Sequence, residues 1–570
     1  LAACAAAGAA LLLSACGGAA EPDPTSSPPP LTAAARATPT LAPATAPPEL
    51  IAEPTAAVAT ATPAPVRARP TPPADSPGGV LKLAVSQAAP HFDIQREVSP
   101  ALSTWGVGLI YSRLFRYAAE PDSLIECELC ESWELAGPGM LRVRLRPDVL
   151  WQDRAPLNGR RLAAGDLVFS YERQREAGAA NSDLLRGIGA IEAPDARTIE
   201  FEIAQPNADL LFNLADGRSR IVAPEAVAEN GDLRAGPNVG TGPWELLDAT
   251  GFFSIYERNE SYFEPGLPYL DGLEVTSIPD ARTRVIAFRV GMLDIVDSTG
   301  AEAARALQDF PEVRAVTVTN LGAGAEIAIN TSAPPFVSPR ARAAVFSALD
   351  PWRDALEVWG GDGIVTLGLP VPDPSWLLPE DAMRTAFADA ERARGLLSLS
   401  DVTPGEPVEI TVGQFGDQYL EQARRLAETL GGLGFDTVIR EVSTRVFADE
   451  VWIGGDYQVF VGAQAPVDGL SDDLFSVYHS RGAWNTTGYH SQELDELIEQ
   501  QAAEMDPAVR KRLVQSAQVK ILAGAHRFTV AARVTHWLQW PYVHGFSPSP
   551  ARGENHFLSL VSVGEKPDLF

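Results

Sequence analysis

A long stretch without core-forming residues restricts where this chain can fold. Residues 19–77 are rich in Pro, Ala and Thr, carry repeated Thr-Pro and Pro-Pro pairs, and have almost no aromatic or large apolar side chains. Such a segment cannot bury enough apolar surface to offset the entropy of ordering its backbone. We therefore expect residues 17–77 to be a disordered linker and residues 78–570 to hold the folded domain. That length is typical of two or more lobes.

Ahead of the linker, an apolar run of small residues ends in the sequence Leu13-Ser14-Ala15-Cys16 and is followed by two glycines. This pattern is typical of the lipobox of a bacterial lipoprotein signal peptide, in which the cysteine thiol receives the lipid. The run is too short to remain as a membrane span, and the alternatives are a plain secretory signal or a buried apolar segment. We expect residues 1–16 to be the signal peptide and Cys16 to be lipidated. The protein would then be extracytoplasmic, at the cell surface or in the periplasm, and anchored to the membrane by lipid.

The charge of the chain lies almost entirely on the folded domain. Residues 1–77 carry three basic and five acidic side chains, a net charge of −2, which leaves −27 of the total of −29 for the rest. A domain this acidic is a poor match for nucleic acid or for an anionic membrane surface. The sequence therefore predicts no nucleic-acid partner and membrane contact through the lipid anchor alone.

Two cysteines of the folded domain form a single Cys-x-x-Cys motif, Cys127 and Cys130. Outside the cytoplasm, the simplest interpretation is a disulfide that closes a short loop. Two free thiols, a metal site and a redox site are the alternatives, although no further His or Cys lies nearby and the flanks do not look like a thioredoxin-like unit. No metal site and no cofactor are predicted.

Hydrophobic periodicity predicts a mixed α/β fold. Alternating patterns predict strands at 80–85, 141–146, 198–203, 408–412 and 437–442. Helices are predicted for a segment ending at 109–115, for one beginning near Asp166, and for 419–433, 494–505 and 507–522. The strand, helix and strand between 408 and 442 predict a βαβ unit.

A series of short motifs runs through the folded domain, one of which is the run GTGPW at 240–244. In chain order they lie at 131–133, 150–153, 164–170, 240–244, 258–263, 268–273, 278–280, 291–295, 330–336, 487–491 and 506–507. Together they resemble, in the same order, the motifs of the family 5 solute-binding proteins of bacterial ABC transporters, which include peptide-binding and nickel-binding proteins. Each motif alone is weak, but the resemblance covers nearly all of residues 78–550.

The resemblance implies a periplasmic-binding-protein type II-like fold, with two α/β lobes joined by a hinge and an inserted extra lobe. Lobe I would be discontinuous, and lobe II would be the insertion. The boundaries we expect are 78–115, 236–320 and 527–570 for lobe I, 116–235 for lobe II and 321–526 for lobe III.

The resemblance also implies a cleft between the lobes that closes around a solute. The loop at 90–93, with Phe92 and Asp93, should face this cleft, as should the segment 462–468, with Gln464. In peptide binders of the family this segment offers a Trp and an Asp that pairs with the free amine of the peptide. Here Ala463 replaces the Trp and Pro466 stands near the place of the Asp, so Asp468 is the candidate carboxylate, with Asp472 and Asp473 as alternatives. Further candidate ligand-binding residues are Trp105, Trp376 and Trp484.

The function implied is capture and not catalysis. The protein would bind an oligopeptide-like solute, act as a monomer and deliver the solute to an ABC importer permease. Alternatives are a binding protein for a sugar or another small polar molecule, and a ligand sensor without transport. An extracytoplasmic hydrolase is a further alternative, but the chain lacks the Gly-x-Ser-x-Gly and His-Glu-x-x-His motifs.

Overall fold

The computed structural model describes residues 78–118, 125–137, 139–205, 207–361, 363–465, 469–551 and 553–566. All of them belong to one compact unit of the chain. The predicted signal peptide with Cys16, the predicted linker and Asp468 lie outside the described residues.

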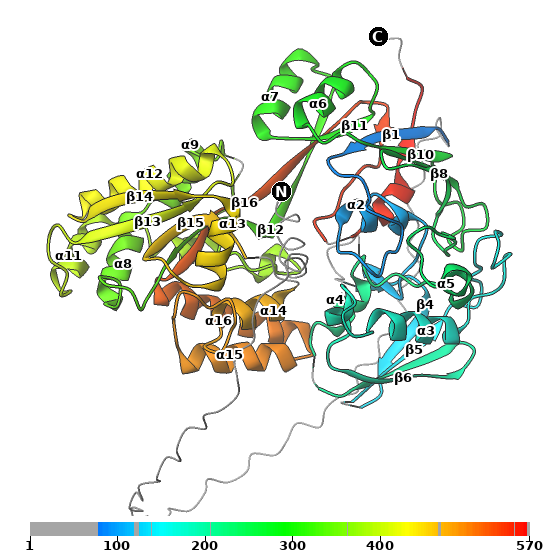
Figure 1. The fold of residues 1–570 in the computed structure, drawn as a ribbon, viewed down its shortest axis with the longest axis horizontal. Coiled ribbons are helices and arrows are strands. Elements are labelled where there is room, and N and C mark those ends of the chain that lie inside the picture. Colours follow the sequence, from blue (N-terminus) through cyan, green and yellow to red (C-terminus); the bar gives the residue numbers. More distant parts are fainter. Residues whose placement is uncertain are drawn as a thin grey trace, which may run out of the picture. The chain divides into compact units, whose positions relative to one another are not determined.

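A ten-stranded mixed sheet extends through most of the fold (Figure 1). Its central strands pair across segments more than 200 residues apart in the chain, as in the pairing of β1 with β11 and of β11 with β16. In order across the sheet, its strands are β14 (Asp436–Val442), β13 (Pro407–Gly413), β15 (Val459–Ala463), β12 (Arg314–Ile329), β16 (Arg527–Gln539), β11 (Ile295–Ser298), β1 (Val80–Val85), β10 (Gly272–Ser277), β9 (Phe253–Arg258) and β8 (Trp244–Ala249).

Two long antiparallel strands, β12 and β16, connect the two halves of this sheet (Figure 1). At one end β16 pairs with β11, and at the other end β12 pairs with β15. The register between β12 and β16 shifts between Asn320 and Gly324 and again between Ala325 and Glu326. These irregularities lie where the chain passes from one half of the sheet to the other.

The remaining strands form smaller sheets. A four-stranded antiparallel sheet has the order β4-β5-β7-β6, and two further pairs are β2 with β3 and β17 with β18. Their bounds are β2 (Phe115–Tyr117), β3 (Ile125–Cys127), β4 (Cys130–Leu135), β5 (Met140–Leu145), β6 (Ile188–Asp195), β7 (Thr198–Ile203), β17 (Val543–His544) and β18 (Ser562–Val563).

Helices cover the sheets and begin at recognisable caps. Asp280, Thr299, Ser338 and Ser491 each accept a backbone N–H of the helix that follows. The α-helices are α2 (Pro100–Ser103), α3 (Ala164–Gln174), α4 (Leu210–Ala215), α5 (Pro224–Asn230), α6 (Ala281–Arg289), α7 (Gly300–Asp309), α8 (Pro339–Ala348), α9 (Pro351–Glu357), α10 (Glu380–Arg384), α11 (Ala390–Ser398), α12 (Asp417–Gly432), α13 (Thr444–Phe447), α14 (Leu470–Asp473), α15 (Gln492–Ala503) and α16 (Pro507–Gly524). Short 3-10 or π turns are η1 (Val107–Leu109), η2 (Ser182–Leu185), η3 (Pro374–Trp376), η4 (Ala448–Ile453), η5 (Leu474–Tyr478) and η6 (His556–Leu560).

The buried apolar side chains form two large cores. The first core takes its buried members from 81–313 and 538–563, and therefore includes both the β1 half of the large sheet and the four-stranded sheet. The second core takes its members from 325–531 and lies around β13, β15 and the N-terminal half of β16. A third, smaller cluster with Phe447 and Phe460 belongs to the β15 side. The crossing strands β12 and β16 thus join two separately packed bodies.

Most predicted elements are confirmed, and the βαβ unit is present as β13, α12 and the parallel strand β14. The helix predicted to end at 109–115 is wrong. Only the short α2 and η1 form there, and the chain then continues as coil into β2. Residues 106–116 are buried, so their apolar character reflects burial on all sides and not one face of a helix.

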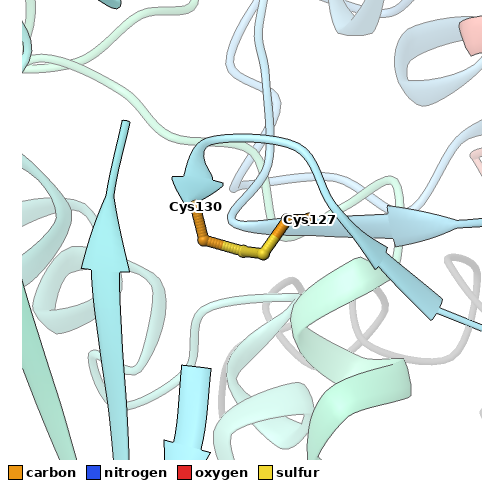
Figure 2. The surroundings of a disulfide bond; sticks show 2 residues. All are labelled: Cys127 and Cys130. Carbon is orange, nitrogen blue, oxygen red and sulfur yellow. A yellow bond between two sulfur atoms is a disulfide. The ribbon is translucent and has the colours of Figure 1, made fainter. Parts of the chain in front are cut away.

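Cys127 and Cys130 are joined by a disulfide in the structure (Figure 2). Cys127 ends β3 and Cys130 begins β4, with their Cα atoms 5.0 Å apart. Between them, Glu128 is buried and bound to the Arg113 guanidinium. The bond therefore closes the turn that leads the chain from the small β2-β3 pair into the four-stranded sheet.

Candidate functional site

The three parallel strands of the second body end at one edge of the large sheet. β13 pairs in parallel with both β14 and β15, so the loops that follow these strands meet at this edge. In open α/β sheets, ligands bind outside the carboxyl ends of such strands. We therefore take this edge, which we call the carboxyl edge, as the starting point for a candidate site. It comprises 414–419 after β13, 443–453 after β14 and 464–465 after β15.

Aromatic rings gather at the carboxyl edge. The ring centroids of Phe415 and Tyr419 lie 5.4 Å apart, those of Phe415 and Trp452 lie 6.0 Å apart, and Trp452 donates its indole N–H to the carbonyl of Ala463 at 3.2 Å. Phe447 is fully buried beneath them, whereas the other three rings are half-buried. Two strand glycines make room, because a Cβ at Gly413 would lie 2.3 Å from the Phe415 ring and one at Gly462 would lie 2.1 Å from the Phe447 ring.

Arg533 lies on the crossing strand β16, and its positive charge acts on Tyr419, one of these rings. Its side chain is exposed and has no hydrogen-bond or ion-pair partner among the described residues. Burial raises the pKa of Tyr419, and the positive charge of Arg533 acts in the opposite direction. An exposed guanidinium without an internal partner can bind a carboxylate or a phosphate.

A second aromatic group lies further along the same strand and belongs to the first body. Trp537 lies four residues further along β16, on the same face of the strand as Arg533. Its ring centroid is 5.2 Å from that of Trp105, which in turn lies 6.1 Å from that of Phe557. Arg533 therefore shares a strand face with an aromatic residue of the first body, and its charge acts on Tyr419 of the carboxyl edge.

Of the residues predicted from the sequence, Trp105 and Gln464 lie in these two groups. Gln464 directly follows β15 and donates to the carbonyl of Gly368 at 2.9 Å, while its own buried carbonyl oxygen has no partner among the described residues. Asp468 follows on the same segment and lies outside the described residues. Asp473, its alternative, is buried, and burial raises its pKa well above the ordinary value of a carboxyl group.

Asp93 and Phe92 lie elsewhere. Asp93 is fully buried, and its carboxylate accepts hydrogen bonds from the Arg173 guanidinium and the backbone N–H of Leu233. Both oxygens are thus occupied within the protein, so this carboxylate holds the framework together instead of facing a solute. Phe92 lines a pocket of about 340 Å³ together with Arg154 and the segments 235–239 and 246–249. None of these lining residues belongs to β12, β16 or the carboxyl edge.

The other two predicted tryptophans belong to the second core. Trp376 is buried, with only 4% of its surface exposed, and the Arg510 guanidinium lies over its ring. Trp484 is half-buried and packs against the same core. In this structure both side chains support the packing of the second body and do not reach the carboxyl edge.

Sequence reasoning missed Arg533, Trp537, Phe415, Tyr419 and Trp452. Phe415 carried a usable signal, since it directly follows a predicted strand and precedes a predicted helix, where the carboxyl-end rule applies. Arg533 and Trp537 carried none, because their place follows from the pairing of β16 with β12, about 200 residues away.

Other features of the described residues narrow the chemistry. No group of three or more His, Cys, Asp or Glu side chains is arranged to hold a metal ion within the described ranges. Among those same residues, no helix combines the length and apolar character of a membrane span.

Comparison with known proteins identifies the family. Residues 125–486 match the family described as bacterial extracellular solute-binding proteins, family 5 Middle. The chain belongs to family 5 of the bacterial extracellular solute-binding proteins. The resemblance noted from the sequence motifs is thereby confirmed, and so is the fold that it implied, a periplasmic-binding-protein fold of mixed α/β type with a large central sheet.

Relatives within the family bind different solutes. The dipeptide-binding protein of Escherichia coli is 24% identical over 486 residues, which cover 79% of this chain and 88% of the relative. The heme-binding protein A of Haemophilus influenzae is likewise 24% identical, over 488 residues that cover the same shares of each chain. The substrate-binding protein CtaP of Listeria monocytogenes has the same fold, with a TM-score of 0.74 at 17% identity over 86% of this chain and 100% of CtaP. The family and these neighbours are binding proteins and not enzymes.

Proposed function

We propose that this protein is a lipid-anchored, extracytoplasmic receptor that captures a peptide-like solute and delivers it to the permease of an ABC importer. Two bodies joined by two crossing strands favour this mechanism, because such a connection lets the bodies rotate about the strands. Only the closed form would contact the solute from both bodies, so the solute would shift the population toward closure. We retain the lobe boundaries of the sequence prediction, with lobe II as the insertion, and propose that the protein acts as a monomer.

One observation carries this proposal: the crossing strand β16 carries an exposed Arg533, unpartnered within the described ranges, on the same face as Trp537 of the first body, and the Arg533 charge acts on Tyr419 of the second body. Trp537 packs on Trp105, and Tyr419 packs on Phe415. A solute held there would meet a cation at its centre and flat apolar surfaces at its ends. We infer that the solute carries an acidic group, as a peptide does at its C-terminus, together with apolar or aromatic parts.

A non-peptide solute remains the second candidate, and the sequence of the segment after β15 favours it. Peptide binders of the family share a Trp and an Asp in this segment, and here Ala463 and Pro466 stand in their places. An organic acid without a free amine would need Arg533 but no carboxylate partner. Both candidate solutes therefore carry an acidic group, and only the peptide also carries a free amine.

Native mass spectrometry of the purified protein tests the proposal. Wild type is expected to carry a bound small molecule with at least one acidic group, and Arg533→Gln to retain at least about tenfold less of it, because the charge-assisted hydrogen bonds to the solute are lost. Arg314→Gln, which alters an exposed arginine of the other crossing strand, is the matched control and should retain the solute. A solute without an acidic group would contradict the role of Arg533. A protein that carries no solute and binds no peptide would contradict capture itself.

The lipid anchor has its own test. Cys16→Ala removes the thiol that would receive the lipid, so the variant is expected to leave the membrane fraction almost completely. Cys4→Ala changes a cysteine of the same leader and should fractionate like wild type. A Cys16→Ala variant that stays with the membrane as fully as wild type would contradict lipid anchoring. Fractionation followed by immunoblotting provides the measurement.

A further inference from the structure

A buried ion pair connects the two bodies at a second place, outside the crossing strands. Arg510 of α16 pairs with Asp209, the residue before α4, and their side chains are only 3% and 13% exposed. Arg510 belongs to a helix of the second core, whereas α4 contributes Leu210 and Leu214 to the first core. Figure 1 shows α4 beside α14, next to α16. This contact therefore spans two bodies that are otherwise packed separately.

Each nitrogen of the Arg510 guanidinium donates a hydrogen bond at this contact. Besides Asp209, its guanidinium donates to the carbonyl of Ala208 at 2.8 Å and to the Ser471 hydroxyl at 3.0 Å. Its Nε donates to the Gln501 side chain at 3.2 Å. Such saturation is required of a buried guanidinium, because each unsatisfied donor would keep its full desolvation cost.

The backbone joins the two bodies at the same place. The second oxygen of Asp209 accepts the N–H of Ser471 at 3.0 Å, and the N–H of Ala208 donates to the carbonyl of Ala502 at 2.9 Å. Asp209 is itself held in place, since its backbone N–H donates to the Asn207 side chain at 3.0 Å. We call the set Ala208, Asp209, Ser471, Gln501 and Arg510 the interlobe clasp.

Each of these bonds joins two protein groups, and none of them includes an atom of a solute. We propose that the interlobe clasp holds the two bodies in this arrangement, which we take as the closed one, before any solute binds, so that Arg510 and Asp209 are positioning residues for capture. Closure that is already favoured costs the solute less binding energy, and the apparent affinity rises by the same factor as the closed population. The role of the clasp in capture rests on the proposed function. The effect of the clasp on closure does not depend on that function.

The closed population can be measured without a solute. Spin labels on cysteines introduced at Ala193, exposed on β6, and Arg394, exposed on α11, report the distance between the bodies. The full chain is used, with Cys4 and Cys16 replaced by serine so that only the new cysteines react. Wild type should give one narrow distance distribution. In Arg510→Gln and Asp209→Asn, a longer distance should appear, with the closed-to-open ratio lowered at least about tenfold.

A control separates loss of the clasp from general destabilisation. Arg284→Gln breaks a pair whose arginine is buried to a similar extent, Arg284 with Asp297, but both partners lie within the first body. This variant should lose stability and keep the distance distribution of wild type. Arg510→Lys keeps the charge and loses most of the hydrogen bonds, so it should give an intermediate distribution and serves if Arg510→Gln does not fold.

Three results would overturn the proposal: a broad, long distribution in solute-free wild type, unchanged distributions in the Asp209→Asn and Arg510 variants, or equal opening in Arg284→Gln. Because no solute is present, none of these results bears on whether the protein captures one. Conversely, failure to find any solute would leave the measured distances valid.

Discussion

An Arg173→Gln variant is expected to lose about 3–5 kcal/mol of its free energy of unfolding at neutral pH. Arg173 pairs with Asp93, and the two side chains are only 4% and 0% exposed. Removing the guanidinium leaves the Asp93 carboxylate buried without its countercharge, and the Gln95 side chain loses its donor as well. Chemical denaturation of both proteins at pH 7 measures the difference. Arg353→Gln, which breaks an exposed pair with Glu357, should cost less than about 1 kcal/mol.

The effect of Arg173→Gln should depend on pH in a defined direction. Burial alone would raise the pKa of Asp93, but the hydrogen bonds and charge of Arg173, with the N–H groups of Leu233 and Gln95, lower it below its ordinary value. In wild type, this carboxylate therefore contributes stability above about pH 4, the ordinary Asp value, and loses it as the pH falls through the lowered pKa. In the variant the unpaired carboxyl protonates more readily, so the deficit should shrink from pH 7 to pH 4. A constant deficit would contradict a charged Asp93.

Acetylation of the N-terminus of a bound peptide is expected to weaken binding by more than about a hundredfold, if Asp468 is the amine-binding carboxylate. A desolvated carboxylate that loses its ammonium partner costs about 3 kcal/mol or more. Asp468→Asn should weaken binding of free peptides to a similar extent and have little effect on acetylated ones. Calorimetry with both proteins and both forms of one peptide provides the four values of a double-mutant cycle.

A matched control and two outcomes complete this test. Asp436→Asn alters an exposed carboxylate at the start of β14, the opposite end of that strand from the carboxyl edge, and should bind both peptide forms like wild type. If wild type binds free and acetylated peptides equally, Asp468 has no such role. If it binds no peptide at all, a solute without an amine is favoured, which agrees with the loss of the family's Trp and Asp.

Individual helices and strands could be predicted from the sequence because the hydrophobic periodicity that indicates them lies within each segment. β1 and β7 match their predicted bounds, since each buries apolar side chains at alternate positions, Leu81 and Leu83 in β1 and Ile199 and Phe201 in β7. Helix α12 differs from its prediction by one or two residues at each end, because no side-chain cap marks its start at Gly416. The buried segment 106–116 was assigned wrongly, because a segment that is buried on all sides has no helical or strand period to detect.

The candidate site could be predicted only where it follows a local element. Gln464 and Phe415 lie just beyond strands that the alternation reveals, whereas Arg533 is placed by a pairing between β12 and β16. The tryptophans show the same limit, since Trp105 lies beside Trp537 while Trp376 lies in the second core. Nothing in the residues next to a tryptophan in the sequence distinguishes a core ring from a ring beside a site.

The interruption in the ladder between β12 and β16 has a consequence for how the protein can turn over. Residues 321–323 have no register partner on β16, while the strands are paired on either side of them. A torsion of this two-stranded ribbon can therefore be absorbed by three residues whose backbone groups are outside the ladder. If the bodies rotate as proposed, opening and closing then break no strand pairing. The same ribbon can twist back and forth while both bodies keep their hydrogen bonds, so the proposed clasp, and not the sheet, would set the cost of opening.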